Sequence, residues 1–153
     1  MTSEMTFNVE IEKTSLGKRI SRYLPGGVRI LLGALFLVVG LNGFLNFLPQ
    51  PTTPMSTGAT AFLGALINTG YMLQLITATQ LIVGALLVAN RFVPLAITLL
   101  APFIVNSIAF HIVLEPTGRP IAFVVLALEL YLAWVYREAF RPMLRPRTAP
   151  AVR

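Results

Sequence analysis

Four long apolar stretches, separated by short polar or proline-rich turns, dominate the pattern of hydrophobic and polar positions along the chain. They cover about residues 28–48, 71–89, 92–114 and 120–138. A helix rises about 1.5 Å per residue, so each stretch comes close to the roughly 30 Å thickness of a bilayer's hydrocarbon core. The pattern therefore predicts an all-α integral membrane protein, a four-helix bundle with four crossings.

A fifth apolar stretch, Gly58 to Asn68, is too short to cross a bilayer. It follows the proline-rich segment 49–56 and ends near Gly70. Proline removes a backbone N–H and disfavours helix in the residue before it, so the first span must stop there. We expect a short interfacial or partly re-entrant helix between the first and second spans.

The charged residues predict the domain organisation and the orientation. We expect a basic, partly disordered cytoplasmic tail over 1–26, a membrane domain over 27–140 and a basic cytoplasmic tail over 141–153. With four crossings, both tails and the Asn90–Arg91 turn share one side, and of the 12 lysines and arginines only Arg119 lies opposite. The positive-inside rule then places both termini in the cytoplasm and the protein in the cell's inner membrane.

Composition excludes several classes of function. The chain has no cysteine, which rules out disulfides, thiolate metal sites and thiol relays on this chain. A single histidine does not make a bis-histidine haem site, and we expect no metal site. The net charge of +6 comes without any groove-reading motif, so nucleic-acid binding is not expected.

Polar side chains inside the apolar stretches are the candidate functional residues, because each needs a partner in hydrocarbon. Counted from the extracytoplasmic helix ends, one polar residue of each span falls in the outer half of the membrane, whereas the cytoplasmic half is almost purely apolar. This asymmetry predicts an outward-facing polar pocket. The ligand-binding or buried polar cluster comprises Asn42, Gln74, Gln80, Asn106, His111 and Glu129.

Each of these residues also has a purely structural interpretation. The amides fit interhelical hydrogen bonding as well as ligand binding, and His111 fits packing near an interface. Glu129 is costly as a buried carboxylate, so we expect it to be protonated or hydrogen-bonded to an amide. Asn106 lies at a similar depth to Gln80 and Glu129, so we expect these three to form a buried lock between helices. On the helix of Asn106, we assign the ligand role to His111, which lies nearer the outer end.

Glycines recur where two helices could approach closely. Small residues at such spacings are the usual means of tight association between membrane helices. We assign Gly33, Gly40 and Gly84 to helix packing.

The ordered motifs over residues 28–136 resemble those of the DoxX family of small four-helix membrane proteins. The residues that carry the resemblance are Arg29, Gly33, Phe36, Gly40, Asn42 and Phe44 in the first span, Gly70, Tyr71, Gln80 and Gly84 in the second, and Phe110 and His111 in the third. Many relatives carry a glutamate where this chain has Gln80, and often a lysine near Asn42. The resemblance implies association with a respiratory or quinone-linked redox complex.

Two classes of function follow. The first is an accessory component of a membrane redox system that binds a quinone or similar lipophile without a covalently bound cofactor. It would act beside redox-partner subunits and not as a self-sufficient enzyme. The alternative is a non-enzymatic membrane scaffold or assembly factor. Both have the lipid bilayer as partner and are compatible with a homo-oligomer. A channel or transporter is disfavoured by the apolar cytoplasmic half.

Overall fold

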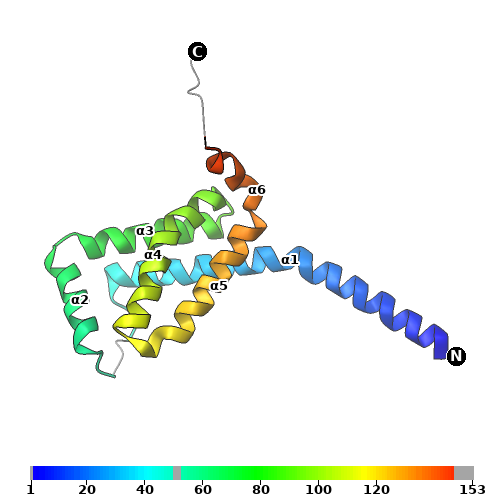
Figure 1. Cartoon of the computed structure of the whole chain (residues 1–153), viewed down its shortest axis with the longest axis horizontal. Helices are drawn as coiled ribbons and strands as arrows, with labels where there is room; N and C mark the ends of the chain where they lie inside the picture. Colours follow the sequence, from blue (N-terminus) through cyan, green and yellow to red (C-terminus); the bar gives the residue numbers. More distant parts are fainter. Residues whose placement is uncertain (1, 50–52, 147–153) are drawn as a thin grey trace, which may run out of the picture.

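The computed structural model describes the backbone of residues 2–49 and 53–146, and the side chains of 21–49 and 53–146. Every regular element in these ranges is helical (Figure 1). The elements are α1 (Thr2–Leu45), α2 (Thr57–Asn68), α3 (Met72–Val88), α4 (Val93–Val113), η1 (Pro116–Gly118), α5 (Arg119–Val135), α6 (Arg137–Phe140) and η2 (Arg141–Leu144). The prediction of an all-α protein is confirmed for the part of the chain that the structure describes.

Three helical stretches are long and apolar enough to cross a membrane: Ser21–Leu45, Val93–Val113 and Pro116–Val135. A fourth crossing is present if α2 and α3, bent by 91° at the break between them, count as one span. Taken alone, α3 has 17 residues, or roughly 25 Å of helix. Helix α3 is therefore shorter than the three stretches that qualify by themselves, which have 25, 21 and 20 residues.

Helix α1 is much longer than its predicted span. It begins at Thr2 and runs without a break through Pro25 to Leu45, whereas the sequence pattern led us to expect a partly disordered segment over 1–26. The Glu, Lys, Arg and Ile residues of this segment are compatible with helix. Figure 1 shows α1 extending well beyond the other helices. Of the predicted C-terminal tail, residues 147–153 lie outside the described residues.

Helices α1 and α3 make the most extensive contact in the bundle, and glycines bring their backbones together. A Cβ atom added at Gly84 would lie 2.5 Å from the backbone nitrogen of Leu37. One added at Gly40 would lie 2.7 Å from the backbone nitrogen of Leu81, and one at Gly33 would lie 2.9 Å from the Cβ of Leu87. The structure thus places all three glycines assigned to packing within this contact.

The hydrophobic core occupies the end of the bundle where α3 turns into α4. We call it the packed end; its buried residues are Leu32, Phe36, Val83, Leu87, Val93, Ala96, Ile97, Leu100, Ile104 and Leu132. Arg29 is buried at the same end, where its guanidinium donates to the carbonyl oxygens of Leu87 and Val88. These carbonyls belong to the last turn of α3. The Leu87 oxygen also accepts from the backbone N–H of Asn90, and Arg29 adds a side-chain cap to that helix end.

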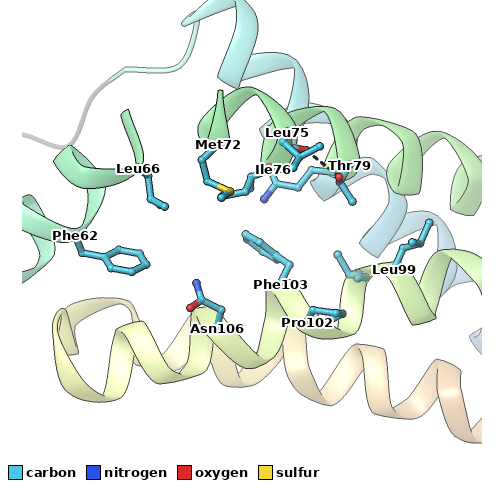
Figure 2. A pocket seen from close by; sticks show the side chains of 12 residues that line it. Phe62, Leu66, Met72, Leu75, Ile76, Thr79, Leu99, Pro102, Phe103 and Asn106 are labelled. Carbon is cyan, nitrogen blue, oxygen red and sulfur yellow. Dashed lines mark hydrogen bonds between the residues drawn. The ribbon is translucent and has the colours of Figure 1, made fainter. Parts of the chain in front are cut away.

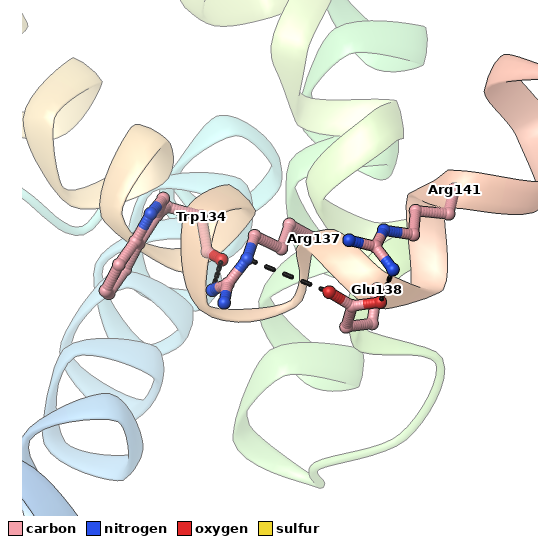
Figure 3. A network of polar contacts seen from close by, with 4 residues as sticks. All are labelled: Trp134, Arg137, Glu138 and Arg141. Atoms are coloured by element: carbon pink, nitrogen blue, oxygen red, sulfur yellow. Dashed lines mark hydrogen bonds and ion pairs between the residues drawn. The ribbon is translucent and has the colours of Figure 1, made fainter.

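The fourth predicted span, 120–138, ends earlier than expected. Helix α5 stops at Val135, and an exposed polar network follows at the break (Figure 3). Arg137 lies 5.0 Å from the centre of the Trp134 ring and donates to the Trp134 carbonyl oxygen at 3.1 Å. Glu138 pairs with Arg141 at 2.8 Å. Exposed pairs of this kind contribute little to stability. The network therefore shows where the apolar stretch ends but does little to stabilise the helix end.

Candidate functional site

Two adjoining cavities lie between the packed end and the opposite end of the bundle, and Leu100 of the packed end lines the first of them. One, of about 370 Å³, lies between α2, α3 and α4 (Figure 2). The other, of about 320 Å³, also reaches α1. Together we call them the amide cavity, and the residues that line both parts are Phe62, Leu66, Ile76, Gln80, Phe103 and Asn106.

The walls follow from helical spacing and from the bend before α3. Phe62 and Leu66 are four residues apart on α2, as Ile76 and Gln80 are on α3, so each pair lies on one face of its helix. Because α2 turns by 91° from α3, its apolar face covers the end of the bundle instead of packing along it. In Figure 2, Phe62 and Leu66 point toward Phe103 across open space.

Carboxamides are the free polar groups of the amide cavity. Gln80 is only 4% exposed, yet its side chain makes no hydrogen bond within the described residues. Asn106, which lines both parts, makes none there either. The hydroxyls of Thr77 and Thr79 are already used, because they donate to the carbonyl oxygens of Leu73 and Leu75 at 3.0 and 2.8 Å.

Asn42 lines the second part of the cavity and lies in the last turn of α1. Its Oδ1 accepts a hydrogen bond of 2.7 Å from the backbone N–H of Leu48. An amide has one acceptor oxygen and one donor nitrogen, so the group that remains for a ligand is the Nδ2 donor. Of the six polar residues singled out in the sequence, the fold thus brings Asn42, Gln80 and Asn106 together.

His111 lies in the last turn of α4, next to the connection to α5, and lines neither part of the amide cavity. Its Nδ1 lies 2.9 Å from the carbonyl oxygen of Glu115. A carbonyl only accepts, so Nδ1 carries the proton of this bond. The ring also fills the space beside Gly118, where an added Cβ would meet its Cε1. The sequence assigned the ligand role to His111 and the structural lock to Asn106. In the structure His111 is bonded to the Glu115 carbonyl oxygen, whereas Asn106 is exposed and lines the cavity.

Gln74 and Glu129 also lie outside the cavity lining. Gln74 is exposed near the start of α3. Glu129 is 5% exposed on α5, and its Oε1 has no hydrogen-bond partner within the described residues. The carboxyl is thus buried, as expected, but that oxygen is not bonded to an amide. The sequence placed Asn106, Gln80 and Glu129 at a similar depth and predicted that they meet. Only Asn106 and Gln80 line the same cavity.

A second polar group gathers at the turn next to the cavity, around Glu115. Its Oε1 accepts from the hydroxyl of Thr117 at 2.6 Å, and its Oε2 accepts from the backbone N–H of Ser56 at 2.9 Å. These two bonds, together with the nearby His111, hold the pKa of Glu115 below its usual range. Arg119 donates to the carbonyl oxygens of His111 and Ile112 in the same turn.

The sequence analysis overlooked the apolar walls and the Ser56–Glu115 contact. Phe62 and Leu66 carried a signal in their four-residue spacing within the short helix, and Ser56 carried one as a serine just before that helix, a common N-cap. Indeed its hydroxyl accepts from the backbone N–H of Ala59 at 3.1 Å. Nothing in the chain order pairs Ser56 with Glu115.

No charged side chain lines either part of the amide cavity, and the described residues contain no cluster of potential metal ligands. The site can therefore hold a largely apolar, uncharged molecule and offer it amide donors and acceptors. No family model matches the chain, and neither curated proteins nor solved structures provide a match.

Proposed function

We propose that the chain is a four-helix bundle of the inner membrane that binds a neutral lipophile, such as a quinone, in the amide cavity. In this proposal α3 supplies the fourth crossing and α2 lies across its extracytoplasmic end, and both termini are cytoplasmic because the basic residues gather on that side. The cavity then opens toward the extracytoplasmic half. The resemblance to DoxX proteins supports an accessory role in a membrane redox system.

The single observation that carries the proposal is the Gln80 carboxamide. The residue is 4% exposed, its side chain makes no hydrogen bond within the described residues, and it lines both parts of the cavity. A carboxamide that faces a largely apolar cavity without a partner is costly, and a bound ligand that supplies a hydrogen bond removes that cost.

A quinone suits this arrangement on chemical grounds. Its ring carbonyls accept hydrogen bonds from amide N–H groups such as those of Gln80, Asn106 and Asn42, and the quinol hydroxyls can donate to the amide oxygens. Its isoprenoid tail matches walls made by Phe62 and Leu66. Without a cysteine, the chain has no thiol redox group of its own, so the electrons would come from partner subunits.

The test is ligand binding in nanodiscs, with native mass spectrometry and a photoreactive short-chain quinone as readouts. Gln80→Leu should weaken quinone binding roughly tenfold, the effect of one lost hydrogen bond. Thr79→Val is the matched control, because it removes a hydroxyl of the same cavity that is already bonded within α3. Labelling that spares Phe62 and Phe103, or equal affinity of wild type and Gln80→Leu, would overturn the proposal.

The scaffold alternative relied on small-residue faces free to dock a partner. Gly33, Gly40 and Gly84 are instead in contact inside the bundle, between α1 and α3. These three glycines therefore do not favour a scaffold, whereas the basic tails fit a scaffold and a lipophile-binding protein equally well.

A further inference from the structure

Helix α2 covers the amide cavity while burying little of itself. Ala59 is its one buried residue, and Phe62 and Leu66 line open space where a core helix would meet packed side chains. Helices that bury few apolar contacts are the segments that open at the lowest free energy. The cover of the cavity is thus held mainly by the two ends of α2.

The N-terminal end is pinned to the turn between α4 and α5. The Ser56 hydroxyl donates to the Leu114 carbonyl oxygen at 2.5 Å, and the Ser56 backbone N–H donates to Glu115 Oε2 at 2.9 Å. A Cβ added at the neighbouring Gly58 would lie 3.0 Å from Leu114 Cδ2, so the first turn of α2 sits closely on the end of α4. We call the contacts of Ser56 with Leu114 and Glu115 the latch.

The C-terminal end is a sharp bend that can act as a hinge. Gly70 has a φ of 77°, a conformation that glycine adopts without strain. It lies in the break where α2 and α3 meet at 91°. A rotation confined to residues 69–71 would move α2 and leave the contact between α1 and α3 intact.

A third cavity lies along the seam between α2 and α4. Its volume is about 210 Å³, and its lining includes Phe62 and Asn106, which also line the amide cavity, and Leu114, which accepts the latch bond. The rings of Phe62 and Phe110 stand 5.6 Å apart within this seam. The seam thus runs from the amide cavity to the latch.

We propose that α2 is a lid that turns about Gly70, and that release of the latch opens the seam between α2 and α4 as the path by which the ligand reaches Gln80. The ligand part of this inference rests on the proposed function, but the motion of α2 does not. Both hydrogen bonds of the latch are donated by Ser56. A single substitution at Ser56 or at Glu115 therefore weakens it.

The test uses the absence of native cysteine. Cysteines introduced at the exposed positions Ala65 on α2 and Val124 on α5 carry spin labels, and pulsed electron resonance in nanodiscs reads the distance between them. With an intact latch we expect one narrow distance distribution. Glu115→Ala should broaden it and lengthen its mean. Glu115→Gln, which keeps the size of the side chain, should shift it in the same direction by less.

Thr60→Ala is the matched control, because the Thr60 hydroxyl donates to the Ser56 carbonyl oxygen within α2 and does not reach the turn. It should leave the distribution unchanged. Quinone dissociation, followed in the same nanodiscs, should be roughly tenfold faster in Glu115→Ala than in Thr60→Ala.

The outcomes separate the two proposals. Identical distance distributions in wild type, Glu115→Ala and Glu115→Gln would overturn the lid. A distribution that responds to Glu115→Ala while no quinone binds would support the lid and overturn quinone binding. Quinone that binds through Gln80 but dissociates at the same rate in both variants would overturn the seam as its path.

Discussion

At the packed end, ten buried side chains from α1, α3, α4 and α5 fill the interior, whereas at the other end Phe62, Leu66 and Phe103 surround open cavities. Both ends use the same classes of apolar residue. They differ in helix geometry, because α1 and α3 lie along one another and α2 crosses the end of the bundle at a steep angle.

The difference teaches where stability and function reside. Between membrane helices the main attraction is van der Waals contact, which a filled interior supplies and an open cavity does not. The packed end therefore holds the bundle together, and at the cavity end amides such as Gln80 have no hydrogen-bond partner in the part of the chain that the structure describes. Four predictions, from the largest expected effect to the smallest, test this division.

The largest effect is expected from Gly84→Ala. The new Cβ would meet the backbone nitrogen of Leu37 at 2.5 Å and the carbonyl oxygen of Gly33 at 2.8 Å, and neither backbone can move alone. We expect a loss of about 3 kcal/mol in the free energy of unfolding, measured by denaturant titration in mixed micelles. Gly64→Ala is the control, since nothing lies within 4 Å of its added Cβ. Equal stability of the two variants would contradict the close contact.

Leu87→Ala compared with Leu66→Ala tests the division directly. Leu87 is fully buried at the packed end, and Leu66 lines the amide cavity. We expect Leu87→Ala to lower the free energy of unfolding by about 2 kcal/mol, because it leaves a void in a filled interior. Leu66→Ala should cost less than half as much, since one side of Leu66 already faces open space. The same titration measures both, and the reverse order would refute the division.

A smaller effect is expected from Arg29→Met, which keeps the length of the side chain but removes the donors to Leu87 and Val88. The loss of this cap should cost about 1 kcal/mol in the free energy of unfolding. Hydrogen exchange should rise in the last turn of α3 and stay unchanged in α2. Arg22→Met, at an exposed position of the same helix, should alter neither.

The smallest effect is expected from acid acting on the latch. The pKa of Glu115 is lowered in the folded protein, so the carboxylate's contribution is complete above its usual value of 4.5 and is lost as the pH falls through the lowered pKa. We therefore expect exchange of the α2 amides, corrected for intrinsic rates, to rise only in strong acid. His111 and Arg119 face the same turn. Exchange in Glu115→Gln should lack this pH dependence.

The short helix shows how far the sequence analysis reached. Its existence, length and end near Gly70 followed from an apolar stretch too short to span, bounded by prolines and a glycine, and the structure has α2 over Thr57–Asn68. The angle to α3 did not follow, because it depends on the backbone torsions of the break and on what Ser56 meets. The cavity walls on Phe62 and Leu66 were missed for that reason.

The polar residues show the same limit. Their depth predicted that Gln80 and Asn106 would meet, and they line one cavity. Depth could not show that His111 and Glu129 lie apart from the cavity residues. The Nδ1 of His111 bonds to the Glu115 carbonyl oxygen, and Glu129 lies outside the cavity lining. Two residues at equal depth can face different neighbours, and only the rotation of each helix about its axis decides which.

The sequence by itself determined the helical class, the apolar stretches and the glycines at which helices can approach, because these depend on local composition and on the 3.6-residue period. Only the tertiary structure decided that α2 covers the end of the bundle, that Ser56 meets Glu115, and that Gln80 has no hydrogen-bond partner among the described residues. These features join residues far apart in the chain. Helical period fixes the face on which a side chain lies, but the partner of that face is set by how the helices pack.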